Sequence, residues 1–177
     1  MNDVDTTPGS EIKEYEDRWV LRPMRGGRVV RTSWHPERIE FAMDTPFRIV
    51  VGYGAEMAHG SIAEDAPTRH AISHWTKVEV AQMVSAPVLS SVLFKSGSLR
   101  IAFGNGWQLF VSDRHPDVSA TVFFGDAPMW DRSGMVGQAG FPVVAIDPWT
   151  GRRIDAPPWP PRPPDLDFSN GSDDING

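Results

Sequence analysis

Residues 99–111, LRIAFGNGWQLFV, repeat the pattern of residues 39–51, IEFAMDTPFRIVV. A shift of 60 residues superposes the two segments without a gap and matches seven apolar positions: Ile39 with Leu99, Phe41 with Ile101, Ala42 with Ala102, Met43 with Phe103, Phe47 with Trp107, Ile49 with Leu109, and Val51 with Val111. The large apolar residues lie two apart, so they share one face of an extended strand. Each segment therefore predicts a β-hairpin with one buried face.

The strands that precede the two hairpins extend the repeat. At the same shift, Val29 and Val30 match Leu89 and Ser90. Two three-strand units, residues 28–54 and 88–114, then lie on either side of a predicted helix. Units of this kind bury their apolar faces against each other. The sequence predicts a mainly β fold, either a sandwich or an open barrel, with one short α-helix.

The glycines of residues 104–106 allow two interpretations, a cradle for a phosphate group or a turn between strands. A phosphate cradle lies between a strand and the start of a helix, whereas here a strand pattern follows. A three-residue hairpin loop commonly ends in a left-handed residue, which Gly106 suits. Pro46, its counterpart in the first copy, cannot adopt that conformation. We therefore expect a turn at 104–106 and a different turn in the first hairpin.

Further segments show strand or helix patterns. Alternating β-branched and aromatic residues predict strands at 28–34, 38–43, 47–53, 88–94, 98–103, 107–112, 118–124 and 141–146, with 68–75 as another short strand. One helix is predicted from Lys77 to about Ser85. Thr76 and Glu79 form a capping box at its start, and Pro87 ends it.

Composition limits the classes of protein that this chain can belong to. A length of 177 residues suits one domain, which we place at 18–155. We expect a disordered leader (1–17) before it and a Pro-rich disordered tail (156–177) after it. The tail is either a ligand for another protein or a spacer. A net charge of −6 argues against nucleic acid as the main partner. The chain has no cysteine, which excludes disulfides and thiolate metal sites.

The sequence shows no secretory signal and no apolar run of membrane-spanning length. We therefore expect a cytoplasmic protein without a membrane partner.

Histidines and carboxylates raise the question of catalysis or metal binding. His70 and His74 have the spacing of helical metal ligands, but the pattern around them is that of a strand, and no third ligand follows. Two acidic or mixed clusters, Glu64–Asp65 and Asp113–His115–Asp117, could supply a hydrolase with a base and a carboxylate. No nucleophile elbow accompanies them. We expect no metal, no cofactor and no enzymatic activity, and we keep a hydrolase as the third hypothesis.

Two predicted loops, 52–67 and 125–140, are longer than a minimal β fold needs. Both contain Met, Gly and an aromatic residue, a composition suited to adaptable contacts. Trp130, Trp149 and Trp159 lie in Gly/Pro-rich segments, where they either contact a partner or cover a sheet edge. These loops are the first places to expect a partner site.

The run from Gly97 to Val111 resembles an uncharacterised, mainly actinobacterial family of small β proteins. The family signature, G-x-L-x-[IL]-x-F-x-[DN]-G-x-x-L-x-V, is matched by eight residues: Gly97, Leu99, Ile101, Phe103, Asn105, Gly106, Leu109 and Val111. The family's earlier hairpin and late strand correspond to RIEFAM (38–43) and FPVVAID (141–147), so the resemblance covers about residues 19–150. It implies a fold and transfers no catalytic residue.

In size, acidity and lack of cysteine the chain is also similar in type to the immunity factor of a mycobacterial NAD-hydrolysing necrotizing toxin. This analogy implies a non-enzymatic antitoxin that blocks the active site of a cognate toxin as a 1:1 heterodimer. We expect the following residues to contact that partner: Tyr53, Met57, His59, Asn105, Trp130 and Met135. The alternative is a regulatory module that binds a small molecule or peptide.

Overall fold

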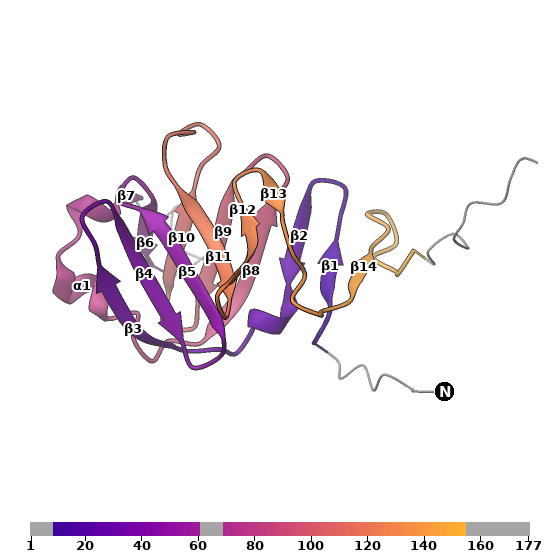
Figure 1. Cartoon of the computed structure of the whole chain (residues 1–177), viewed down its shortest axis with the longest axis horizontal. Coiled ribbons are helices and arrows are strands. Elements are labelled where there is room, and N and C mark those ends of the chain that lie inside the picture. The colour runs from indigo at the N-terminus through magenta and orange to yellow at the C-terminus, as the bar shows by residue number, and fades with distance from the viewer. Residues whose placement is uncertain (1–8, 61–68, 155–177) are drawn as a thin grey trace, which may run out of the picture.

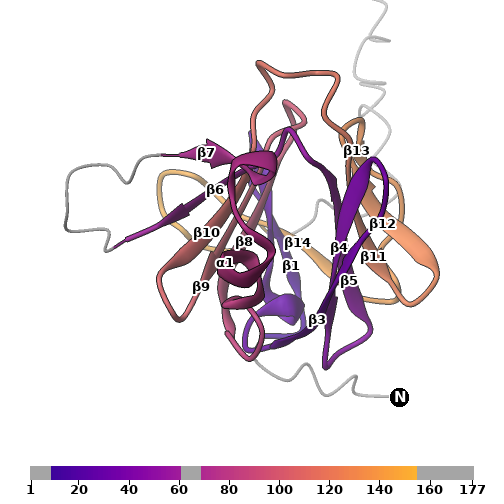
Figure 2. The same ribbon diagram turned by 90° about the vertical axis from the view of Figure 1, so that its left-hand side faces the viewer.

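Two β-sheets packed face to face form the body of the protein (Figures 1 and 2). The computed structural model describes residues 9–60 and 69–154. The predicted tail 156–177 and residues 1–8 of the predicted leader lie outside the described residues.

The large sheet has eight strands, in the order β14 (Val143–Ala145), β1 (Ile12–Glu14), β2 (Arg18–Leu21), β8 (Val88–Phe94), β9 (Leu99–Phe103), β10 (Trp107–Val111), β6 (Glu56–His59) and β7 (His70–Ala71). The small sheet has six, in the order β13 (Gly134–Met135), β12 (Ala127–Asp131), β11 (Ala120–Phe124), β5 (Phe47–Gly52), β4 (Arg38–Met43) and β3 (Val29–Trp34). The helices are α1 (Lys77–Ala81) and two 3₁₀ turns, η1 (Arg22–Met24) and η2 (Ile72–His74).

The prediction of a mainly β fold with one short α-helix is confirmed. Eight predicted strand segments correspond to observed strands: β3, β4, β5, β8, β9, β10, β11 and β14. The sheets are separate layers, and neither closes on itself within the described residues. The fold is a sandwich rather than a closed barrel.

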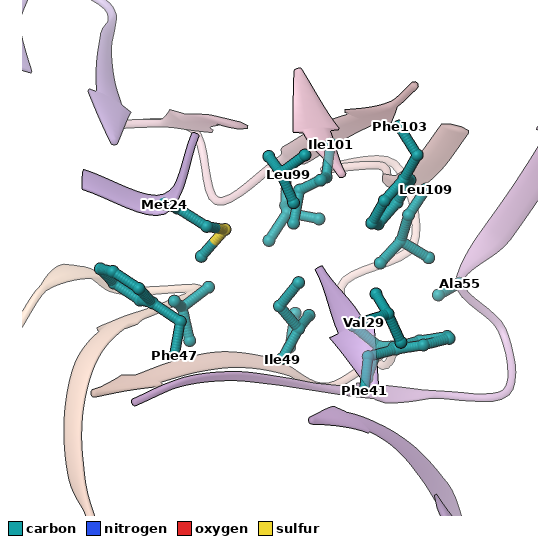
Figure 3. Packing of buried hydrophobic residues seen from close by; sticks show 14 of the residues in the cluster. Met24, Val29, Phe41, Phe47, Ile49, Ala55, Leu99, Ile101, Phe103 and Leu109 are labelled. Atoms are coloured by element: carbon teal, nitrogen blue, oxygen red, sulfur yellow. The ribbon is translucent and has the colours of Figure 1, made fainter. Parts of the chain in front are cut away.

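The two predicted units face each other across the core (Figure 3). Phe41 and Ile49 of the small sheet point toward Ile101 and Leu109 of the large sheet, and all four side chains are fully buried. In β4, β5 and β9 burial follows the alternation from which the hairpins were predicted, whereas every residue of β10 is buried.

Residues 12–14, predicted as part of a disordered leader, form the strand β1. This strand pairs antiparallel with β2 and parallel with β14, and Ile12 is fully buried. A three-residue strand has no local signal of its own, because its stability comes from the two neighbouring strands.

The two segments predicted as long loops also contain strands. β6 lies in the first and adds to the edge of β10, while β12 and β13 lie in the second. Proline is rare inside strands, and Pro128 of β12 lies where the β11–β12 register shifts between Val122 and Phe123. Such an irregularity is where a sheet tolerates proline.

The predicted strand at 68–75 is a two-residue strand, β7, followed by η2.

The internal repeat extends over ten strands, β3–β7 and β8–β12. In both copies the fourth strand crosses to the opposite sheet, so that β6 pairs with β10 and β11 pairs with β5. The hydrogen bonds that follow these strands also match: Gly60 N donates to Gly106 O, and Gly125 N donates to Pro46 O. Each copy thereby completes the sheet of the other.

The copies meet at an antiparallel bridge between Arg28 and Pro87. Val88 N donates to Gly27 O at 2.8 Å, and Val29 N donates to Ala86 O at 3.3 Å. Because these two bonds join corresponding residues in opposite senses, they mark a local pseudo-twofold axis.

This bridge corrects the alignment of the first strands by one residue. Val29 corresponds to buried Val88, not to Leu89, and the exposed Val30 corresponds to Leu89. Both Val30 and Leu89 lie at register shifts in their strand pairs. The one-residue difference arises in the turn that follows: four residues, 35–38, separate the paired Trp34 and Ile39, whereas five, 94–98, separate the paired Leu93 and Leu99. The shift is therefore 59 residues before this turn and 60 after it.

The turn before each first strand follows the same symmetry. Gly26 has φ +86° and its counterpart Ser85 has φ +73°. Gly26 N donates to Val88 O at 2.8 Å, and Ser85 N donates to Val29 O at 2.7 Å. The left-handed conformation is thus part of the repeat, occupied by glycine once and by serine once.

Helix α1 occupies the sequence position in the second copy that strand β2 has in the first. Its predicted capping box is present, since Glu79 N donates to Thr76 Oγ1 and Thr76 N donates to the Glu79 carboxylate. The ammonium of Lys77, at the first position of the helix, lies 5.5 Å from the centre of the Trp34 ring on β3. The helix therefore packs beside the edge strand of the small sheet, an edge that would otherwise be open to other strands.

Ser85→Gly is predicted to raise the free energy of unfolding by about 0.5–1 kcal/mol. Relief of the left-handed strain exceeds the extra entropy that glycine has in the unfolded chain. Gly26→Ala is the matched control: its new Cβ meets nothing within 4 Å, so only backbone strain acts, and the variant should be less stable. Urea denaturation measures both. A destabilised Ser85→Gly would contradict the assignment of this turn.

Glu79→Gln is predicted to destabilise the protein at pH 7 and to have less effect at pH 3. Hydrogen bonds from the backbone and then the hydroxyl of Thr76 lower the pKa of Glu79 below its usual 4.5. A carboxylate with a lowered folded-state pKa stabilises the fold above its unfolded-state pKa and loses this effect as the pH falls through the folded-state pKa. Thermal unfolding at both pH values, with Glu16→Gln as control, measures this. Equal differences at pH 3 and pH 7 would contradict it.

Candidate functional site

The two copies of the repeat differ at the connection that leads from the third strand to the fourth. Residues 52–54 join Val51 to Ala55 in the first copy, whereas residues 112–119 join the equivalent Val111 to Ala120 in the second, five residues more. The longer connection carries the chain from the large sheet to the small one and projects beyond the end of the sandwich (Figures 1 and 2). We call residues 113–119 the end loop.

Arg132, in the turn between β12 and β13, holds the end loop in place. Its guanidinium donates hydrogen bonds to the carbonyls of Ser112 at 2.8 Å, Val118 at 2.7 Å and His115. Its Nε donates to Gly97 O at 3.2 Å. One half-buried cation thus joins both ends of the end loop to the β8–β9 turn.

Backbone hydrogen bonds fold the end loop further. His115 N donates to Ser112 O and Val118 N donates to His115 O, each at 3.2 Å. Asp113 N donates to Ser98 Oγ at 3.0 Å. The side chains of residues 113–117 nevertheless remain exposed. The loop is therefore a fixed backbone that presents polar side chains to solvent.

A cleft of about 690 Å³ lies beside the end loop, and we call it the end cleft. It is lined by three segments, 35–38 from the β3–β4 turn, 52–54 after β5, and 117–119 from the end loop. The loop approaches the residues after β5 closely: a Cβ on Gly54 would lie 2.6 Å from Val118 Cγ2. Gly54 therefore cannot be replaced without moving the wall of the cleft.

Tyr53 joins the end cleft to the β3–β4 turn. Its hydroxyl donates to the carbonyl of His35, and its ring stacks on Trp34 with centroids 5.7 Å apart. These contacts fix the ring while one side of it borders the cleft.

The end cleft carries groups of both charges. Glu37 and Asp117 supply carboxylates, Arg38 a guanidinium and His35 an imidazole, and all four residues are exposed. Within residues 9–60 and 69–154, no histidine forms an ion pair with a carboxylate, and no group of three metal-ligating side chains occurs. The arrangement suits reversible recognition of polar groups on another molecule.

Of the predicted partner-contact residues, only Tyr53 borders the end cleft. His59 and Asn105 lie together at the opposite end of the sandwich, with His59 Nε2 3.2 Å from Asn105 O. The amide of Asn105 is used internally, since it donates to Gln82 O at 2.8 Å and its Oδ1 accepts from Trp107 N at 3.4 Å. The predicted turn is present, with Gly106 at φ +90°.

The other three predicted residues belong to the core or its margin. Met57 lies opposite Leu109 and is fully buried, as is Trp130 on β12. Met135 is half-buried and packs against the core. The sequence pattern predicts loops around Met57 and Trp130, whereas the strands β6 and β12 turn both side chains inward. They form no surface that a partner could contact.

The other tryptophans, histidines and carboxylates considered as candidates from the sequence lie away from the end cleft or outside the described residues, apart from the residues of the end loop. Trp149 is 93% exposed at the tip of a turn, and Trp159 lies outside the described residues, as do Glu64 and Asp65. His70 and His74 have ring centroids 6.4 Å apart on β7 and η2, beside Trp75. The sequence pattern does not indicate the other end-cleft residues His35, Glu37 and Arg38 as functional. The sequence feature that could have indicated the cleft is the difference in length between the connections at 52–54 and 112–119.

Comparison with protein-family models, curated proteins and solved structures found no match to this chain. No helix in the described segments is both long and apolar enough to cross a membrane.

Arg132→Ala is predicted to lower the free energy of unfolding by about 2–3 kcal/mol, because the carbonyls it binds lose charge-assisted hydrogen bonds. The backbone amide hydrogens of His115 and Val118 should exchange with solvent at least about tenfold faster, because a loss of about 1.4 kcal/mol of local stability raises the exchange rate tenfold. Arg100→Ala, on the exposed face of β9, is the control. Wild-type stability and protected loop amides in Arg132→Ala would contradict the anchoring role.

Proposed function

We propose that this protein is a non-enzymatic binding protein that recognises another protein through the end cleft and the end loop. The observation that carries the proposal is the anchoring of a projecting loop by Arg132. A loop whose backbone is already fixed loses little conformational entropy when it binds, so more of its contact energy becomes affinity.

The chemistry of the surface supports a protein as the partner. The end loop presents Asp113, Arg114, His115 and Asp117 to solvent, and the cleft beside it carries both signs of charge. Mixed charges of this kind select a complementary surface and raise the rate of association. Tyr53, held by its ring and its hydroxyl, adds a rigid aromatic of the type enriched where binding energy concentrates.

The finer proposal concerns the identity of the partner. We propose a cytoplasmic antitoxin that forms a 1:1 complex with a cognate toxin and blocks its active site with the end loop. Support comes from the resemblance in type to an immunity factor and from the net charge of −6, which suits a basic or nucleotide-binding cleft. An NAD glycohydrolase is the toxin class that the resemblance implies.

An antitoxin gene is expected to lie beside the gene of its toxin. Asp117→Arg is predicted to weaken binding to the toxin that such a neighbouring gene encodes at least about tenfold, a loss of about 1.4 kcal/mol. The charge reversal places a cation where a basic partner is expected to meet a carboxylate. Asp126→Arg, in the exposed turn between β11 and β12 at the opposite end of the molecule, is the matched control. Isothermal titration with the purified partner measures both variants.

Equal affinity of the two variants would contradict the assignment of the binding surface. A neighbouring gene product that does not bind the wild-type protein would contradict the antitoxin proposal itself.

A further inference from the structure

A second cavity, of about 640 Å³, lies at the other end of β5 and has a different character. Phe47, the first residue of β5, lines it, whereas Gly52, the last, lines the end cleft. Five residue steps of extended chain separate these residues by about 17 Å. The cavity, which we call the aromatic pocket, is thus separate from the proposed partner surface, and its volume falls within the range of small-molecule sites.

Three phenylalanines form the apolar side of the aromatic pocket. Phe47 packs edge-on against Phe124, with centroids 5.0 Å apart at 72°, and lies parallel to Phe141 at 5.9 Å and 12°. Phe124 and Phe141 meet edge-on at 5.1 Å and 84°. Phe124 and Phe141 are only half-buried. Their partly exposed rings offer a surface for a planar apolar group.

Two arginines line the same pocket, Arg22 in η1 and Arg25 directly after it. Within the described residues, neither side chain forms an ion pair or a hydrogen bond. By contrast, Arg48 pairs with Glu40, and Arg132 binds backbone carbonyls. Two arginines that line one cavity and have no acidic partner among residues 9–60 and 69–154 provide the donors for an anion site.

The internal repeat shows that the fold does not require these arginines. At the spacing of 59 residues set by the backbone bridge, Arg22 and Arg25 correspond to Ala81 and Val84. The second copy forms the same left-handed turn and the same backbone hydrogen bonds without a cation at either position. The arginines therefore have no role that the shared architecture explains.

We propose that the aromatic pocket binds a small molecule with a planar aromatic body and an anionic group, either a carboxylate, a sulfonate or a phosphate. The aromatic body packs on Phe124 and Phe141. The anion accepts charge-assisted hydrogen bonds from Arg22 and Arg25. This site is additional to the protein-binding surface at the end cleft and does not depend on it.

The test is a fluorescence titration of the full chain with 8-anilinonaphthalene-1-sulfonate, an aromatic anion. We expect saturable binding at one site per chain. Arg22→Ala and Arg25→Ala should each weaken binding at least about fivefold, while Arg100→Ala leaves it unchanged. N-phenyl-1-naphthylamine, which lacks the sulfonate, should bind the wild type and both arginine variants equally. Phe141→Ala should weaken both probes, with Phe141→Leu as a second variant if the alanine form does not fold.

Three results would overturn the proposal: no saturable binding of the anionic probe, no effect of either arginine variant, or an equal loss of the neutral probe in the arginine variants. Partner binding gives an independent readout. Arg22→Ala should bind the partner as the wild type does, because Arg22 lies at the opposite end of β5 from the end cleft. Failure of the proposed toxin to bind would leave the result at the aromatic pocket unchanged.

Discussion

The backbone bridge between Arg28 and Pro87 is the contact on which the rest of the architecture depends. Its two hydrogen bonds, from Val88 N to Gly27 O and from Val29 N to Ala86 O, join the copies at corresponding residues. After this bridge, the first three strands of each copy lie in one sheet and the fourth strand lies in the other. Because β6 completes the sheet of the second copy and β11 that of the first, neither copy is complete without its counterpart. We therefore expect the sandwich to fold as one cooperative unit.

The features to which we assign function are those that break this symmetry. The end loop is five residues longer than its counterpart, and the cation that anchors it, Arg132, lies in the β12–β13 turn. The aromatic pocket has two arginines where the other copy has alanine and valine. A residue that both copies share is explained by the fold. A residue that only one copy has, on an exposed or cleft-lining position, needs another explanation, and binding supplies it.

The sequence predicts the hairpins and the helix well, because alternation and the Thr76–Glu79 capping box are local signals. It aligns the first strands of the two copies at a shift of 60 residues where the structure shows 59, because nothing in the sequence marks the turn between Leu93 and Leu99 as one residue longer than the turn between Trp34 and Ile39. β1 and β6 escape prediction, because strands this short are stabilised by their neighbours rather than by their own residues. Because β6 is not predicted, the sequence places Met57 in a loop and predicts it as a contact residue. The end cleft brings together three segments distant in sequence, which only the pairing of strands reveals.

The central claim, that the shared scaffold carries the fold while the end loop carries recognition, is tested most directly by exchanging the two connections. Replacing residues 112–119 with Gly-Tyr-Gly, the sequence of residues 52–54, gives the second copy the connection of the first. Calorimetry of the exchanged protein mixed with its partner is the measurement. We predict a single cooperative unfolding transition, as for the wild type, and loss of partner binding. Partner binding with unchanged affinity in a folded exchange variant would contradict the account.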